Sequence, residues 1–149
     1  MENQESSITG LDVPLDAIGF EFDELSAHRV AGHFLVTLKA CQMFSTIWQR
    51  VKVLHGGVSA MIAEGIASMG AHIACGFQRV AGIQLNINHL KPAELGEIVW
   101  EVQLWKNDLS KSKDRIVTSS STVTLICNRP IPEHSKADAE KLKNMFAKL

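Results

Sequence analysis

The chain has 149 residues, of which 46% are hydrophobic and 21% are charged, and its formal net charge at pH 7 is -1. This length fits one domain, residues 1–149, with a substantial buried core, and the composition excludes an intrinsically disordered chain. The near-neutral charge argues against a nucleic-acid-binding protein, which usually carries a strong basic excess.

The first elements in chain order are short. Residues 1–27 are expected to form a lead-in, because Pro14 and Gly19 interrupt any long element. The polar, acidic N-terminal residues do not resemble a secretory signal or a transit peptide. A strand is predicted over Arg29–Leu38, where apolar residues alternate along the chain, and a loop follows at Cys41–Val53.

A long helix is predicted to begin at the Gly56-Gly57 pair and to end at Gly76. Apolar residues recur along it with helical spacing, and the opposite face carries small residues instead of charged ones. Such a helix is expected to be buried nearly all round. The stretch is apolar enough to suggest a membrane span, but Glu64 and His72 within it favour a helix buried in a non-membrane protein.

Strands dominate the remainder of the chain. Alternating apolar residues predict a half-buried strand around Ile83–Ile87, a second at Ile98–Leu104 and a long one at Arg115–Cys127. Residues 134–149 hold a short amphipathic helix and the C-terminal tail. This order of elements predicts an α+β fold in which an antiparallel sheet wraps around one helix.

The chain contains three cysteines, Cys41, Cys75 and Cys127. They are far apart in sequence and have no spacing typical of a metal site. We therefore expect free thiols in a reducing compartment, where they act as small buried hydrophobic residues.

The best candidate for chemistry is the glycine pair together with Glu64. Adjacent glycines at a helix start let a ligand approach the backbone and leave N–H groups unpaired. These donors, at the positive end of the helix, suit negative charge developing on the carbonyl oxygen of a thioester. Glu64 is the only carboxylate between His55 and Gly76, and it could attack the carbonyl or deprotonate water.

Each of these residues also has a purely structural interpretation. Glu64 could be a solvated position on an exposed edge of the helix, although its small and apolar neighbours favour a functional role. His55 could order the glycine turn by hydrogen bonding or take part in catalysis, and both roles remain open. His72 is expected to be a cation at the helix C-terminus.

The run His55-Gly56-Gly57-Val58, followed by Ala63-Glu64, resembles the signature of hotdog-fold thioesterases in the 4-hydroxybenzoyl-CoA group. The likeness is strongest to the plant peroxisomal 1,4-dihydroxy-2-naphthoyl-CoA thioesterases of phylloquinone synthesis. It extends through residues 19–26, 79–90, 100–106 and 119–132. The C-terminal Ala147-Lys148-Leu149 adds to it, because this ending is similar to the Ser-Lys-Leu address read by the peroxisomal import receptor.

This resemblance implies roles for several residues. Glu64 would be the nucleophile or general base, the Gly56 N–H would polarise the thioester oxygen, and Ser68 would help to place water. The resemblance implies no metal or redox cofactor. It further implies a homo-oligomer, commonly a dimer of dimers, with each active site and its CoA between two subunits. The residues that would contact the CoA substrate are Gly57, Ser120 and Ser121.

An active-site glutamine is also part of the family pattern. Gln49 stands six residues before His55, as the family spacing requires, and is the preferred candidate. Gln42 is the alternative, because its Cys-Gln-Met-Phe surroundings resemble the run that contains the glutamine in the plant enzymes.

The chain departs from the family pattern where Val99 joins Trp100 directly. In relatives a strand and a tight turn lie at this point, so about a dozen residues, one strand with its turn, are absent. Losing an interior strand leaves unpaired backbone groups and an uncovered helix face. The sheet is expected to close by re-pairing its remaining strands, or the chain to be a poorly folding variant.

Two other functions fit the same residues. A hotdog hydratase or dehydratase would use the histidine and the acid as a general acid/base pair on a β-hydroxyacyl chain. A non-catalytic acyl-CoA-binding protein would use the same pocket without turnover. The adjacent glycines and the upstream glutamine favour hydrolysis.

Overall fold

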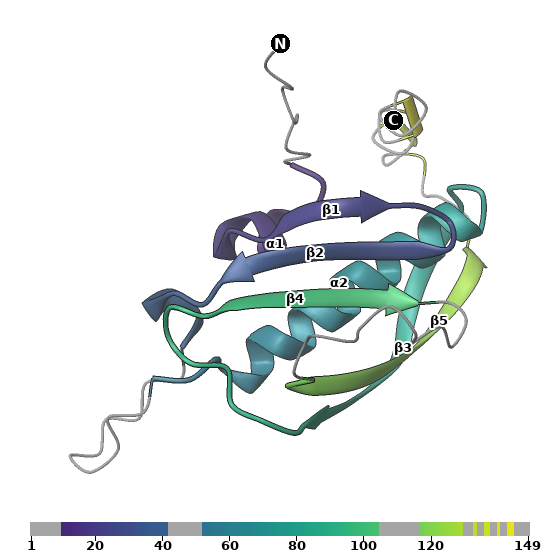
Figure 1. Ribbon diagram of the computed structural model, residues 1–149. Helices are drawn as coiled ribbons and strands as arrows, with labels where there is room; N and C mark the ends of the chain where they lie inside the picture. The colour runs from purple at the N-terminus through teal and green to yellow at the C-terminus, as the bar shows by residue number, and fades with distance from the viewer. Residues whose placement is uncertain are drawn as a thin grey trace.

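The computed structural model describes residues 10–41, 52–104 and 117–129, together with residues 133, 136, 137, 140, 143 and 144 (Figure 1). Its elements, in chain order, are α1 (Val13–Ile18), β1 (Glu21–Leu25), β2 (Arg29–Leu35), the 3₁₀ helix η1 (Leu38–Ala40), α2 (Gly56–Ala74), β3 (Arg79–His89), β4 (Ile98–Leu104) and β5 (Ser119–Arg129).

The strands form two antiparallel sheets that enclose the long helix α2. One sheet has the order β1-β2-β4 and the other pairs β3 with β5. Helix α2 packs against β2, β3, β4 and β5, and the short helix α1 lies against it as well. Figure 1 shows α2 running behind β2 and β4. The predicted α+β arrangement, with strands around one helix, is therefore present.

The direct junction of Val99 with Trp100 lies inside β4. This strand pairs with β2 along its whole length, from Arg29↔Leu104 to Leu35↔Ile98. Among the described strands β4 and β5 do not pair, so the sheet is divided at this point. The division falls where the sequence predicts a missing strand, and the described strands do not close it by re-pairing.

The expected lead-in includes α1 and β1. The side chain of Asp12 caps α1 by accepting a hydrogen bond from the Leu15 N–H at 2.9 Å, and Gly19, with φ of +76°, ends it. Leu15 is buried against α2 at Gly65, where an added Cβ would lie only 3.1 Å from the Leu15 Cδ1. The absence of a side chain at Gly65 therefore lets the two helices pack closely.

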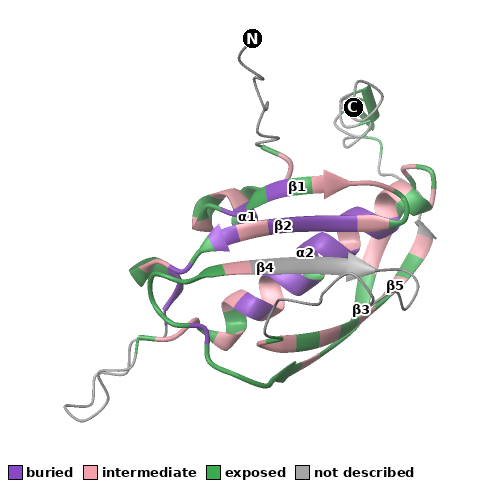
Figure 2. Cartoon of the chain, viewed as in Figure 1, coloured by how far each residue is buried: buried purple, intermediate pink, exposed green. Residues whose placement is uncertain are grey.

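Helix α2 has the bounds and the burial that its sequence predicts. His55 is its N-cap, it ends at Ala74, and Gly76 follows with φ of +68°. Its residues are buried or half-buried on the apolar face and on the small-residue face, and only Gly57, Glu64 and Ala74 are exposed (Figure 2). No helix among the described residues is long and apolar enough to span a membrane.

Three predicted strands differ from the structure. Strand β2 ends at Leu35 and not at Leu38. The Val36 N–H still bonds to the Glu97 carbonyl, but the Glu97 N–H donates to the Glu94 carbonyl instead of returning to Val36, and the chain then turns into η1. Strand β3 is largely exposed, with Ile83 at 59%, whereas alternation predicted a half-buried strand. Strand β5 begins at Ser119, after the non-strand residues Val117 and Thr118, and ends at Arg129 and not at Cys127. The predicted first residue, Arg115, lies outside the described residues, as does most of the C-terminal helix at 134–149.

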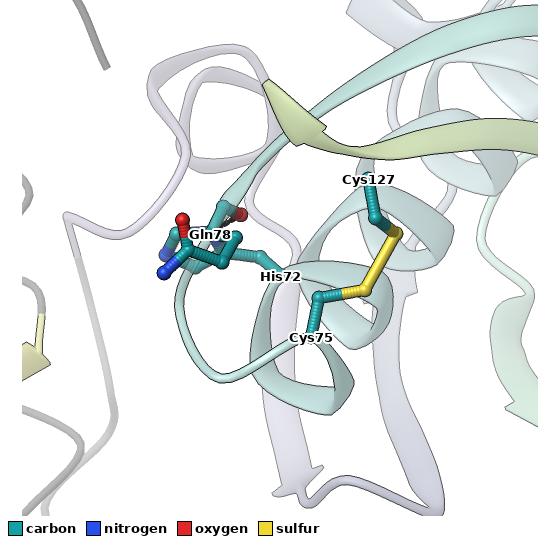
Figure 3. The surroundings of a disulfide bond; sticks show 4 residues. All are labelled: His72, Cys75, Gln78 and Cys127. Carbon is teal, nitrogen blue, oxygen red and sulfur yellow. Dashed lines mark hydrogen bonds between the residues drawn. A yellow bond between two sulfur atoms is a disulfide. The ribbon is translucent and has the colours of Figure 1, made fainter. Parts of the chain in front are cut away.

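The expectation of three free thiols is wrong for two of the cysteines. Cys75, the C-cap of α2, forms a disulfide with Cys127 on β5, and the two Cα atoms are 6.6 Å apart (Figure 3). Their separation of 52 residues carried no pairing signal, because the fold alone brings the helix end beside the strand. Cys41 is free and buried, as expected.

Candidate active site

The glycine turn before α2 presents one backbone donor that has no partner among the described residues. The Gly57 N–H donates to the Nδ1 of His55 at 2.9 Å, so the imidazole caps the helix. The N–H groups of Val58 and Ser59 donate to the His55 carbonyl oxygen. The Gly56 N–H makes no hydrogen bond to any other described residue. It is therefore the amide available to an oxyanion at the positive end of α2.

His89, at the end of β3, lies directly over this turn. A Cβ on Gly56 would approach the His89 Cε1 to 3.3 Å, so the missing side chain leaves room for the imidazole. His89 was not predicted as a site residue. No periodic signal marks it in the sequence, and only the fold places the end of β3 at the start of α2.

A cavity of about 350 Å³ opens beside Gly56. It lies between the two sheets, with Phe34 and Val99 on one side and Ser119 on the other, above Ser59 and Ile62 of α2. Its walls are mainly apolar. A space of this kind can enclose a small apolar or aromatic group.

Glu64 stands on the side of α2 that faces β3. Its Oε1 accepts a hydrogen bond of 2.7 Å from the Ser68 hydroxyl, one helical turn further on. The same oxygen lies over Gly82 of β3, 3.2 Å from where a Cβ on that residue would stand. The side chain is exposed in the single chain, whereas the sequence predicted an acid enclosed by apolar residues. It is exposed because the neighbouring strand offers it a glycine and no covering side chain.

The helix itself separates Glu64 from the Gly56 amide. The two residues are eight positions apart on α2, which corresponds to about 12 Å along the axis. This separation favours an arrangement in which the two groups that act on one thioester carbonyl come from different copies of the chain.

The remaining predicted site residues are scattered. Ser120 and Ser121 lie on β5 opposite Asn88 and Ile87 of β3. Gln49 and its alternative Gln42 lie outside the described residues. No group of three or more His, Cys, Asp or Glu side chains in the described ranges is placed to hold a metal ion.

His72 closes the turn after α2 and lies away from the glycine turn. Its Nδ1–H donates to the Gln78 carbonyl oxygen at 2.8 Å (Figure 3). Its ring packs edge-on against Phe77. These contacts support the structural interpretation of His72 over a part in the chemistry.

Comparisons with known proteins bear on the fold and the chemistry. Residues 52–111 match the model of the thioesterase superfamily. The chain is 51% identical to the 1,4-dihydroxy-2-naphthoyl-CoA thioesterase 2 of Arabidopsis thaliana, over 93% of this chain and 94% of that protein. It is 31% identical to the 1,4-dihydroxy-2-naphthoyl-CoA hydrolase of Escherichia coli, over 50% of this chain and 62% of that protein.

A solved structure shows the same fold. The crystal structure of zebrafish thioesterase superfamily member 2 superposes with a TM-score of 0.60 at 16% identity, covering 82% of this chain and 88% of that one. The identity to the Arabidopsis protein extends over almost the whole chain. The chain belongs to the thioesterase superfamily, has its hotdog fold, and is a thioester hydrolase.

Proposed function

We propose that the chain hydrolyses the CoA thioester of an aromatic acid, with 1,4-dihydroxy-2-naphthoyl-CoA as its substrate in phylloquinone biosynthesis. The choice of acyl group rests on the names of the Arabidopsis and Escherichia coli relatives. The observation that carries the chemistry is the Gly56 amide, which has no partner in the described part of the chain and begins the helix that also bears Glu64.

In this reaction water cleaves the bond between the acyl carbon and sulfur, giving a carboxylic acid and free CoA thiol. The Gly56 N–H donates to the carbonyl oxygen as it gains negative charge. Glu64 acts through Oε2, because Ser68 already holds Oε1. It either attacks the carbonyl carbon, with water later releasing the acyl group, or removes a proton from the attacking water.

The proposed active site takes Gly56 from one subunit and Glu64 from another. The separation of about 12 Å between them within one chain supports this arrangement. Strand β3 supports it too, since among the described strands it pairs only with β5 and it exposes Ile83 and Leu85. A homodimer formed along β3, and a dimer of dimers built from it, would cover this surface.

The remaining roles follow the same proposal. Gln49, or alternatively Gln42, supplies an amide near the thioester, and His55 orders the turn that presents Gly56. Gly57, Ser120 and Ser121 contact the CoA. The C-terminal Ala147-Lys148-Leu149 binds the peroxisomal import receptor, which makes the peroxisome the compartment of action.

The experiment compares CoA thiol release from aryl-CoA substrates by the wild type and by Glu64→Ala. We expect the variant to lose turnover by a factor of at least about 10² while its affinity for CoA is retained. Glu21→Gln is the matched control, because it removes an exposed carboxylate on β1 and should keep wild-type turnover.

Two results would contradict the proposal. A chain that binds aryl-CoA but releases no thiol in either form would be a binding protein. A chain that hydrates an enoyl-CoA and leaves the thioester intact would be a hydratase.

A further inference from the structure

We propose that Gly82 on β3 is a positioning residue for the reaction: together with Ser68 it orients the Glu64 carboxylate so that Oε2 is the reacting oxygen. This inference rests on the proposed function of Glu64. It adds a strand residue from outside the helix motif and assigns different tasks to the two carboxylate oxygens.

The absence of a side chain at position 82 is explained by space and not by backbone conformation. Gly82 is not among the glycines with positive φ, so its backbone angles are open to other residues. Glycine within a strand costs about 0.5–1 kcal/mol relative to alanine, and it often marks a close approach. The group that approaches here is the Glu64 carboxylate, 3.2 Å from where a Cβ would stand.

The local shape of β3 contributes to this space. The pairing register of β3 with β5 shifts between Gly82 and Gln84. Such an irregularity leaves an extra residue and re-aims the neighbouring side chains, and bulges are common beside active sites. The strand is therefore altered at the residue that Glu64 lies over.

The two oxygens of Glu64 have different surroundings. Oε1 accepts the hydrogen bond from Ser68 at 2.7 Å and is also the atom nearest to Gly82. No described residue donates a hydrogen bond to Oε2. The bonded oxygen fixes the rotation of the carboxylate, and the other oxygen is left to meet the substrate. A Cβ at position 82 would press on Oε1 and turn the whole group.

The test is Gly82→Ala, with Gly65→Ala as the matched control. Both substitutions add one methyl group at similar closeness, 3.2 Å from Glu64 and 3.1 Å from Leu15 respectively. We expect Gly82→Ala to lower kcat by about 10- to 100-fold with KM little changed, because a small displacement of a reacting group has effects of this size. Gly65→Ala should keep its kcat, and thermal melts of both report folding.

A double variant separates positioning from a general structural effect. The side chain in Glu64→Asp is one methylene shorter, which should relieve its contact with position 82, so adding Gly82→Ala to it should lower kcat by less than about twofold further. The inference is wrong if Gly82→Ala has wild-type kcat, if Gly65→Ala loses as much, or if the Gly82 effect persists in the Asp background.

Ser68 provides a second test should Gly82→Ala fail to fold. Ser68→Ala should lower kcat with KM unchanged, and Ser68→Thr, which retains the hydroxyl, should restore most of it. Wild-type kcat in Ser68→Ala would overturn the inference. A wild-type chain without hydrolysis would remove the proposed function as well, whereas normal hydrolysis with unaffected Gly82 and Ser68 variants would remove this inference alone.

Discussion

Gly56 allows a single hydrogen-bond donor to be removed while the helix start is kept. It is the first residue of α2, a position that favours proline, and His55 before it has the extended backbone that proline requires, with φ of -68° and ψ of 130°. We predict that Gly56→Pro lowers kcat by about 10²- to 10³-fold, the cost of losing one oxyanion donor.

Gly56→Ala is the control for this substitution, because it also places a Cβ near His89 but keeps the N–H. It should therefore lose much less activity than Gly56→Pro in the same assay of thiol release. Equal kcat values for the two variants would show that the amide does not polarise the thioester.

Single residues were predictable where a local pattern identified them. The glycine pair, Glu64 and Ser68 stand on one helix, and helical spacing alone relates them. The structure favours the capping role for His55, since its Nδ1 accepts from the Gly57 N–H. The sequence did not identify Gly82 and His89 as site residues. Both lie on β3, and only the folding of that strand against α2 brings them close to Glu64 and Gly56.

At the level of elements, the disulfide gives a direct prediction. It joins the end of α2 to β5 across 52 residues. Reduction, or the double substitution Cys75→Ser with Cys127→Ser, should lower the free energy of unfolding by about 2–4 kcal/mol, because the unfolded chain regains its freedom. Urea unfolding with and without dithiothreitol measures this difference.

Thiol titration of the denatured chain provides the control. The oxidised protein should show one reactive thiol, that of Cys41, and the reduced protein three. Cys41→Ala should leave the response to dithiothreitol unchanged. Three reactive thiols in the oxidised, denatured chain would contradict the Cys75–Cys127 pairing.

Local signals located α2 well and the strand ends less well. Glycines at both ends and helical periodicity defined the helix, because these preferences act within a few residues. The end of β2 depends instead on its partner strand, because the Glu97 N–H, about 60 residues further along the chain, donates to Glu94 and not back to Val36, and no local window contains this contact. The burial of β3 likewise depends on which other elements pack over it. The alternation of apolar and polar residues along the strand does not determine this.

For the whole molecule, the sheet is divided beside β4, the strand that contains the direct Val99–Trp100 junction, and the described strands do not close it by the re-pairing expected from the sequence. Strand β4 pairs with β2 along its whole length, yet the described strands form two separate sheets. A cavity of about 350 Å³ lies between these sheets. Exposed apolar residues on both sheets, among them Ile83 and Ile98, accompany this division. A divided sheet of this kind leaves apolar side chains exposed to solvent in the single chain. Contacts with a second chain that cover these side chains therefore become more important for stability.

The final prediction tests whether the active site is shared between two chains. Glu64→Ala and Gly56→Pro each disable one half of the proposed site, so each should be inactive alone. In a two-fold dimer every site takes Gly56 from one chain and Glu64 from the other. Mixed dimers therefore contain one site with both defects and one intact site.

Co-refolding the two variants in equal amounts should restore activity. Half of the dimers are mixed and half of their sites are intact, so about a quarter of the wild-type turnover is expected for a two-fold symmetric assembly. Refolding each variant alone controls for recovery. If both groups acted within one chain, no mixture would exceed the inactive variants, and the separation of Gly56 and Glu64 along α2 would then have to be bridged by another residue.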